Sequence, residues 1–203
     1  QNWLKEHFAD PYVKKAQAEG MRSRAAYKLE ELLERGQLLK PGMLVVDLGA
    51  APGGWSQVLR RSLRNKRGDD IGRVLALDIL DMASIPGVEF LQGDFREEHV
   101  LAAFEALVGA RPVDLVLSDM APNMSGVPLV DQARIMHLAE LGLEFSKAHL
   151  KPEGAFLVKV FQGTDYESFL RSMRETFKTV AVRKPDASRD RSAELYLLGR
   201  ILR

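Results

Sequence analysis

Three ionisable residues stand where the local pattern predicts buried apolar strands. Lys159 interrupts the apolar run 155–161, Asp119 directly follows a second such run, and Glu194 directly precedes a third. A lysine inside a buried strand is rare unless it is paired or functional. One interpretation is a buried ion pair, Lys159 with Asp119 or Glu194, that holds the sheet register. Because buried pairs add little net stability over apolar replacements, three such residues near strand ends favour a reactive site.

A fourth charged residue, Lys28, belongs to the predicted helix 24–35. It stands at the edge of the apolar stripe of that helix, one turn from Leu32. On its own, this pattern is typical of a surface lysine whose stem covers apolar surface while its ammonium stays in water.

A turn of small residues follows the first predicted strand and leads directly into a helix. It runs from Gly49 to Gly54, and small residues there let a ligand lie against the backbone at a helix N-terminus. The spacing resembles a dinucleotide-binding turn, but Ala51 replaces the central glycine and Pro52 removes a backbone donor. Both changes disfavour a pyrophosphate, so we expect a ligand without one.

Two carboxylates close the next two predicted strands. Asp78 ends the second strand, where a carboxylate can accept hydrogen bonds from both hydroxyls of an adenosine ribose. Asp94 ends the third strand, where it can accept the exocyclic amine of adenine with Phe95 beside the ring. The alternative is that each acid only caps a following helix. Together with the glycine turn, the two acids favour an adenosine-containing ligand.

Short apolar runs alternate with helical patterns, which predicts an α/β fold with a mostly parallel sheet. The 203 residues suffice for one sizeable core, and no linker divides them, so we expect a single domain over 1–203 with a helical extension at 1–40. Ser23 is the expected N-cap of the helix that ends at Gly36. Strands are expected at 43–48, 73–78, 89–91, 113–118, 155–161, 179–183 and 195–201, and helices at 10–19, 24–35, 55–64, 97–108, 130–149 and 165–177.

Composition excludes several classes of protein. There is no cysteine, so disulfides and thiolate chemistry are excluded, and the four histidines show no metal-ligand spacing. No apolar run approaches a membrane span, and no export signal is evident, which fits the cytoplasm. P-loop and nucleophile-elbow motifs are absent.

The net charge of +1 conceals an uneven distribution. Residues 1–40 carry eight Lys and Arg against six Asp and Glu, and residues 171–203 carry nine against four, which leaves the middle at −6. Basic ends around an acidic middle predict either a cationic surface for a polyanion or solvated charge without function.

Four motifs in this order resemble the FtsJ/RrmJ family, S-adenosylmethionine-dependent ribosomal RNA 2′-O-methyltransferases. They are DLGAAPGGWS at 47–56, SDMAPN at 118–123, VKVFQG at 158–163 and KPDASR at 184–189 with Ser192 and Glu194. The resemblance spans nearly the whole chain from about Trp3. It implies a single-domain Rossmann-like methyltransferase fold, a seven-stranded mostly parallel sheet with helices on both faces.

The resemblance also implies site residues and a substrate. The family's catalytic tetrad falls on Lys28, Asp119, Lys159 and Glu194. The substrate implied is a uridine of the A-loop of large-subunit ribosomal RNA, modified in the assembled subunit, and the enzyme is expected to be a monomer without metal. The family's contacts to S-adenosylmethionine fall on Gly53, Trp55, Asp78, Asp94 and Asp119. The residue pattern adds Gly49, Gly54 and Phe95 to these expected contacts.

The mechanism expected from this set needs a positioned ribose hydroxyl and an acceptor for its proton. A neutral Lys159 would be the general base, whereas a charged Lys159 would orient the hydroxyl and stabilise the developing alkoxide. Lys28 and Glu194 would hold the ribose and its phosphate. Basic residues beside the site would bind RNA: Arg22, Arg24, Arg189 and Arg191.

Three other functions are compatible with parts of the pattern. A nicotinamide-dependent oxidoreductase would use the same strand, turn and Asp78, but Ala51 and Pro52 oppose it. A non-catalytic RNA-binding module of ribosome assembly would have no use for a lysine inside a strand. A 2′-O-methyltransferase acting on transfer RNA or a messenger cap would share the chemistry and differ only in substrate.

Overall fold

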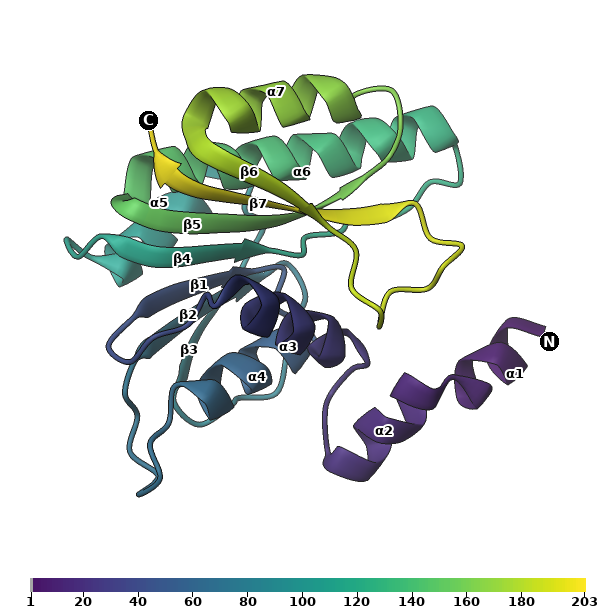
Figure 1. Ribbon diagram of the computed structural model, residues 1–203, viewed down its shortest axis with the longest axis horizontal. Helices are drawn as coiled ribbons and strands as arrows, with labels where there is room; N and C mark the ends of the chain where they lie inside the picture. Colours follow the sequence, from purple (N-terminus) through teal and green to yellow (C-terminus); the bar gives the residue numbers. More distant parts are fainter. Residues whose placement is uncertain (1) are drawn as a thin grey trace.

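One twisted sheet organises the structure, a computed structural model that describes residues 2–203 (Figure 1). Its strand order is β3-β2-β1-β4-β5-β7-β6, and every pair is parallel except those that β7 makes with β5 and β6. The predicted seven-stranded, mostly parallel fold is therefore confirmed. The strands are β1 (Leu44–Leu48), β2 (Arg73–Asp78), β3 (Val88–Gln92), β4 (Val113–Ser118), β5 (Leu150–Phe161), β6 (Phe177–Arg183) and β7 (Glu194–Leu202).

Helices cover both faces of this sheet. Helices α3 and α4 pack on one face, and α5, α6 and α7 pack on the other (Figure 1). The helices are α1 (Asn2–Ala9), α2 (Pro11–Glu19), α3 (Ala25–Gly36), α4 (Gly54–Ser62), α5 (Glu98–Val108), α6 (Pro128–His149) and α7 (Tyr166–Thr176).

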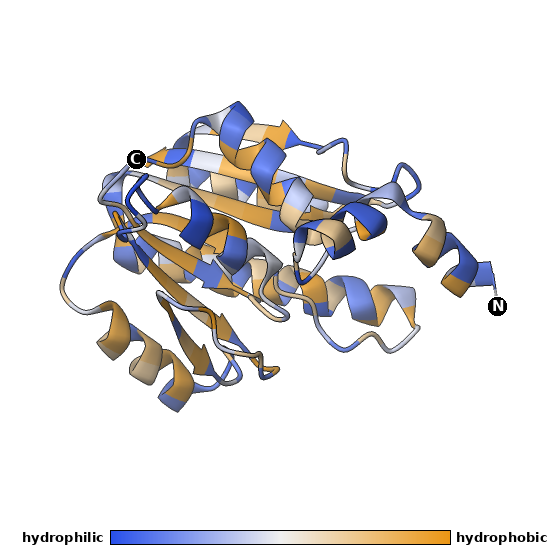
Figure 2. Ribbon diagram, turned by 90° about the horizontal axis from the view of Figure 1, so that it is seen from below, coloured by the Kyte–Doolittle hydropathy of each residue, from blue (hydrophilic) through white to orange (hydrophobic). Residues whose placement is uncertain are grey.

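The strand β1 shows how the core forms. All five of its residues are buried, because a central parallel strand is covered on both faces. Leu44, Val46 and Leu48 join the cluster under α5–α7, whereas Val45 joins the cluster under α3 and α4. This alternation is the two-residue period of a strand. Figure 2 shows the strands largely apolar and the helices with one apolar and one polar side.

The sequence prediction differs from the structure at three places. Helix α1 was not expected, and it has no buried residue, so burial imposes no pattern on it. Strand β5 begins at Leu150, five residues before the predicted start. Ser23 does not cap α3: Arg24 occupies the N-cap position, its side chain makes no capping hydrogen bond, and Ser23 instead packs against Gly54.

The N-terminal helices lie at the edge of the molecule. In Figure 1, α1 extends beyond α2, away from the sheet. Asp10 caps α2 by accepting a hydrogen bond from the Tyr12 N–H at 2.9 Å. Among residues 2–203, no helix is long and apolar enough to cross a membrane.

Candidate active site

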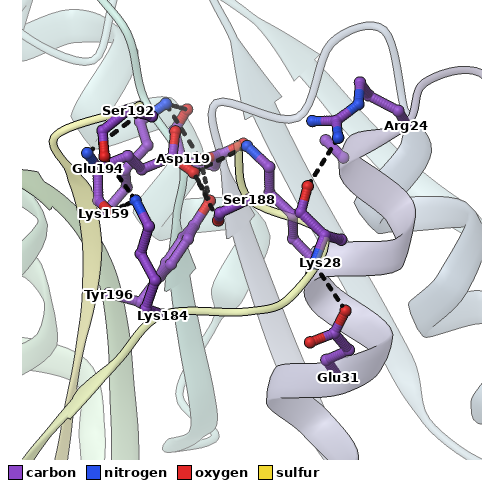
Figure 3. Close-up of polar contacts among 12 residues, drawn as sticks. Arg24, Lys28, Glu31, Asp119, Lys159, Lys184, Ser188, Ser192, Glu194 and Tyr196 are labelled. Atoms are coloured by element: carbon purple, nitrogen blue, oxygen red, sulfur yellow. Dashed lines mark hydrogen bonds and ion pairs between the residues drawn. The ribbon is translucent and has the colours of Figure 1, made fainter. Parts of the chain in front are cut away.

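Two ion pairs meet where the central strands end (Figure 3). Lys159 Nζ lies 3.1 Å from Asp119 Oδ1, and Lys28 Nζ lies 2.8 Å from Glu194 Oε1. The four side chains are only 11 to 19% exposed. The structure thus brings together all four residues of the predicted tetrad, and the ion pair weighed from sequence as an alternative is present within it.

The strand period explains why these side chains share one face. Leu157 lies in the α3/α4 cluster, so Lys159, two residues later, points to the same side. In the register of β5 with β7, Lys159 pairs with Tyr196 and Phe161 pairs with Glu194. Helix α3 packs on that face and supplies Lys28.

Tyr196 joins the two ion pairs, and the sequence prediction missed it. Its hydroxyl lies 3.3 Å from Asp119 Oδ1 and 3.2 Å from Glu194 Oε1, and its side chain is fully buried. Burial and the two carboxylates raise the pKa of Tyr196 well above its ordinary value, so the phenol keeps its proton and acts as a donor. A signal existed, because Tyr196 stands two residues after Glu194 and therefore on the same face of β7.

The charge states in this cluster follow from its geometry. Burial lowers the pKa of Lys159, but Asp119 and Glu194 outweigh it, so the pKa lies above the ordinary lysine value. Burial raises the pKa of Glu194, but Lys28 and Lys159 outweigh it, so that pKa is lowered. Lys159 is therefore an ammonium and Glu194 a carboxylate at neutral pH. Of the two forms of Lys159 considered from sequence, the structure favours the charged one.

The loop between β6 and β7 is held at two places, at its end beside Glu194 and nearer its start against α3. Lys184 Nζ donates to the carbonyl oxygens of Ser192 and Glu194 at 2.7 and 2.6 Å. On α3, Glu31 accepts the N–H groups of Asp186 and Ala187 at 2.7 and 2.9 Å. These bonds fix the loop against the helix that carries Lys28.

A cavity of about 890 Å³ opens beside this cluster at the ends of β1, β2, β3 and β4. Asp119 lines the cavity and also holds Lys159, so it connects the cavity to the ion pairs. The N-terminal part of α6 forms another wall. Five of the residues expected to contact the cofactor line this cavity: Gly49, Asp78, Asp94, Phe95 and Asp119.

Backbone donors contact both of the carboxylates that were predicted to bind an adenosine, and Asp94 accepts the Arg96 N–H at 2.9 Å. Asp78 accepts the N–H groups of Ala51 and Leu80 at 2.8 and 2.9 Å, and no helix begins beside it to be capped. Asp94 is paired with Arg96 at 2.7 Å, and the hydrogen bond from Arg96 lowers its pKa. Asp94 does not cap α5 either, since Glu97 holds the N-cap position.

The remaining expected cofactor contacts lie outside the cavity wall. Trp55 is buried, donates from Nε1 to the Ala25 carbonyl at 2.8 Å and packs against Tyr196. A Cβ on Gly54 would come within 2.5 Å of the Ser23 hydroxyl, so this glycine permits a close approach of α4 to the segment before α3. Gly53 has φ of +116° and lies against Arg22. These residues pack the helices around the site.

The four arginines expected to bind RNA all make contacts within the chain. Arg22 donates to the carbonyls of Pro52, Ala83 and Ser84 and so joins the glycine turn to the loop after β2. The other three contact the N-terminal segment or the β6–β7 loop: Arg24 with Asp10 and Ala187, Arg189 with Asp10, and Arg191 with Glu6. Among them, Arg191 keeps the most exposed side chain, at 67%.

Within residues 2–203, no three His, Asp or Glu side chains gather in a way that could hold a metal ion.

Comparison with known proteins places this geometry in a family. The model of the FtsJ-like methyltransferase family matches residues 21–202. A protein of Dechloromonas aromatica, named ribosomal RNA large subunit methyltransferase E, is 70% identical over 201 residues, which cover 99% of this chain and 96% of the relative. A protein of Stenotrophomonas maltophilia with the same name is 68% identical over 98% of this chain and 92% of its own.

Solved structures show the same fold. A crystal structure described as a ribosomal RNA methyltransferase from Plasmodium falciparum superposes with a TM-score of 0.77 at 26% identity, over 89% of this chain and 98% of that one. An rRNA methylase from Streptococcus thermophilus shares the fold at 12% identity with a TM-score of 0.55, over 90% of this chain and 99% of that one.

Proposed function

This chain belongs to the FtsJ-like methyltransferase family, and on that basis we propose that it transfers a methyl group from S-adenosylmethionine to a ribose 2′-hydroxyl of large-subunit ribosomal RNA. The target we propose is a uridine of the A-loop in the assembled large subunit, modified in the cytoplasm by a monomer of one domain. The observation that carries this proposal is the Lys159–Asp119 pair at the edge of the cavity. The names of the relatives support the RNA class.

The residues of the cavity fit S-adenosylmethionine. Asp78 keeps oxygen lone pairs for the ribose hydroxyls, since two N–H groups of the described chain bond to its carboxylate and a carboxylate can accept about four hydrogen bonds. Asp94 and the buried ring of Phe95 offer an acceptor and an apolar surface to adenine. At Gly49, with φ of +81°, a Cβ would come within 2.7 Å of the Met120 backbone, so only glycine lets the turn approach the loop that follows β4. When bound, the cofactor supplies a methyl group already activated on a sulfonium.

We assign the handling of the ribose hydroxyl to the Lys159–Asp119 pair. As an ammonium, Lys159 has no lone pair for the proton, so it orients the hydroxyl oxygen and stabilises negative charge that develops there. The Asp119 carboxylate, 3.1 Å from Lys159 Nζ, is the nearest acceptor for the hydroxyl proton. This replaces a neutral Lys159 as the general base.

Lys28 and Glu194 hold the other side of the substrate in this proposal. Glu194 neutralises Lys28 at 2.8 Å, so Lys28 offers directed hydrogen bonds to the ribose and its phosphate with little net charge. The Tyr196 hydroxyl bonds to a carboxylate of each ion pair and so holds the two pairs side by side.

RNA binding is assigned to the surface formed by the helical extension at 1–40 and the β6–β7 loop. Exposed Arg191 supplies charge there, and Arg189 and Arg24 lie beside it, tied to Asp10. Arg22 contributes by shaping the loop next to the glycine turn. Phosphate contacts of this kind make affinity depend on salt.

Methyl transfer by a Lys159→Ala variant tests the proposal. The substrate is purified large subunit from cells that lack this modification. The methylated nucleotide is mapped by its neighbouring phosphodiester bond, which resists alkaline hydrolysis. We expect no turnover with Lys159→Ala while S-adenosylmethionine still binds. The control is Lys147→Ala, an exposed lysine of α6 that pairs with Glu144 on the same helix, which should be fully active. Near-normal turnover by Lys159→Ala contradicts the assigned mechanism, and methylation of transfer RNA or a cap instead of the subunit contradicts the assigned substrate.

A further inference from the structure

The first turn of α6 makes an unusual set of contacts with the loop that follows β4. Asp131 accepts three hydrogen bonds from that loop: from the Ser125 N–H at 2.7 Å, the Ser125 hydroxyl at 2.8 Å and the Gly126 N–H at 3.0 Å. Asp131 is only 6% exposed. The donors from Ser125 hold the pKa of this carboxyl below its usual range, so it is ionised at neutral pH.

This loop, residues 119–127, forms a wall of the cavity through Met120, Ala121, Pro122 and Asn123. It contains no helix or strand. Within the described chain, its backbone bonds to other backbone groups lie only at its two ends, where the Asp119 N–H donates to Leu48 and the Val127 carbonyl accepts from Asp131. The shape of the wall between those ends therefore depends on side chains.

Two side chains of α6 supply that support. Besides Asp131, Arg134 donates to the Asn123 carbonyl at 3.0 Å. Arg134 is exposed and makes one bond, whereas Asp131 is buried and makes three. Both side chains are charged, so the bonds of both are stronger than those between neutral groups, and the number and the burial of the bonds decide between them. Asp131 is therefore the main support of this wall.

The same turn also reaches the end of β5. Gln132 donates to the Phe161 carbonyl at 3.3 Å and lies against Gly163. Adjacent residues of α6 thus hold the loop after β4, which begins with Asp119, and the end of β5, which carries Lys159. The Asp131 carboxylate bonds only to Ser125 and Gly126 among the described residues, so its removal acts directly on that loop and not on the Gln132 contact or the Lys159–Asp119 pair.

We propose that Asp131 is a positioning residue for cofactor binding, acting through Ser125 and Gly126 on the cavity wall at 120–123. This inference rests on the proposed function, in which that cavity takes S-adenosylmethionine. It predicts a particular kinetic signature: weaker cofactor affinity with normal turnover once the cofactor is saturating, because no reacting group is displaced.

The experiment compares Asp131→Ala, Asp131→Asn and the wild type. Calorimetry gives the affinity for S-adenosylmethionine, and steady-state assays give kcat and the KM of each substrate. For Asp131→Ala we expect affinity about tenfold weaker or more, from the loss of hydrogen bonds to a charged acceptor. We expect kcat within about twofold at saturating cofactor and an unchanged KM for RNA. Asp131→Asn keeps one acceptor oxygen and should fall between. The control is Glu140→Gln, an exposed carboxylate of the same helix.

Each outcome separates this inference from the proposed function. If the wild type does not bind S-adenosylmethionine, the proposed function fails. If the wild type binds and both Asp131 variants bind equally well, or lose kcat instead of affinity, the positioning role is wrong. Should Asp131→Ala not fold, Asp131→Asn and Ser125→Ala, which removes only the hydroxyl donor, carry the test: unchanged affinity in both overturns the inference.

Discussion

Asp47 makes the stability of this protein depend on pH in an uncommon direction. It is fully buried on β1, and within residues 2–203 its carboxyl group accepts a hydrogen bond from the Ser56 hydroxyl alone, at 2.7 Å. Its other oxygen has no partner among residues 2–203. Burial raises the pKa of Asp47 from 3.8 to about 7, with Asp119 and Asp78 adding to the rise and Ser56 opposing it.

The size of the effect follows from linkage. Between about pH 4 and pH 7 the folded chain keeps this proton and the unfolded chain does not, so the free energy of unfolding falls as pH rises. Each pKa unit corresponds to about 1.4 kcal/mol, which gives a total of about 4 kcal/mol, with about 3 kcal/mol of it lost between pH 5 and pH 8. This contribution is present at acidic pH and is lost through neutrality, opposite to the usual salt-bridged aspartate.

Urea unfolding of the wild type and Asp47→Asn at pH 5 and pH 8 measures this. The amide cannot ionise, so the variant should lack this part of the pH dependence. From pH 5 to pH 8, the free energy of unfolding of the variant should therefore rise relative to that of the wild type by about 3 kcal/mol. Taking the difference between the proteins cancels the other titrating groups. A matched control is Glu153→Gln, an exposed carboxylate at the start of β5, which should follow the wild type. Parallel pH dependence of wild type and Asp47→Asn would refute the reasoning.

Three further results are expected. Gly49→Ala places a Cβ 2.7 Å from the Met120 backbone at φ of +81°, so thermal unfolding should show a loss of about 2 kcal/mol or more, and a loss below 0.5 kcal/mol would contradict the close approach. Tyr196→Phe removes the hydroxyl that donates to two carboxylates, so kcat should fall about tenfold while the affinity for S-adenosylmethionine stays unchanged. An unchanged kcat would show that this hydroxyl does not contribute to the reaction. Arg191→Gln should reduce the slope of log affinity for RNA against log salt by about 1, and an unaltered slope would exclude a phosphate contact there.

The parallel half of the sheet could be predicted because burial leaves a clear pattern. Strands covered on both faces read as continuous apolar runs, and β1, β2 and β4 lie within one residue of their predicted bounds. The early part of β5 could not be found this way, since Pro152 and Gly154 interrupt its run and the pairing with β4 shifts register there. Helix α1 has no buried face, so no apolar period marked it.

The site was predictable in part, and the limit is the distance between its members along the chain. Asp119 and Lys159 stood out as charges in apolar surroundings, which is a local signal. Lys28 did not, because its partner Glu194 is 166 residues away, and a helix pattern alone cannot distinguish a paired lysine from a solvated one. Only the family resemblance singled it out.

Strand geometry alone, without any family resemblance, could have predicted that three of the four tetrad residues lie together. Leu117, Leu157 and Tyr196 face α3 and α4 from three adjacent strands. Residues two positions away share a face, so Asp119, Lys159 and Glu194 must all point to that side. Since β7 runs antiparallel to β5, its first residue lies beside the last residue of β5, as the pairing of Glu194 with Phe161 shows. The reversal of β7 is therefore what brings a second carboxylate to the carboxyl end of the parallel strands, since a parallel β7 would place its first residue, Glu194, at the opposite edge of the sheet, away from Lys159.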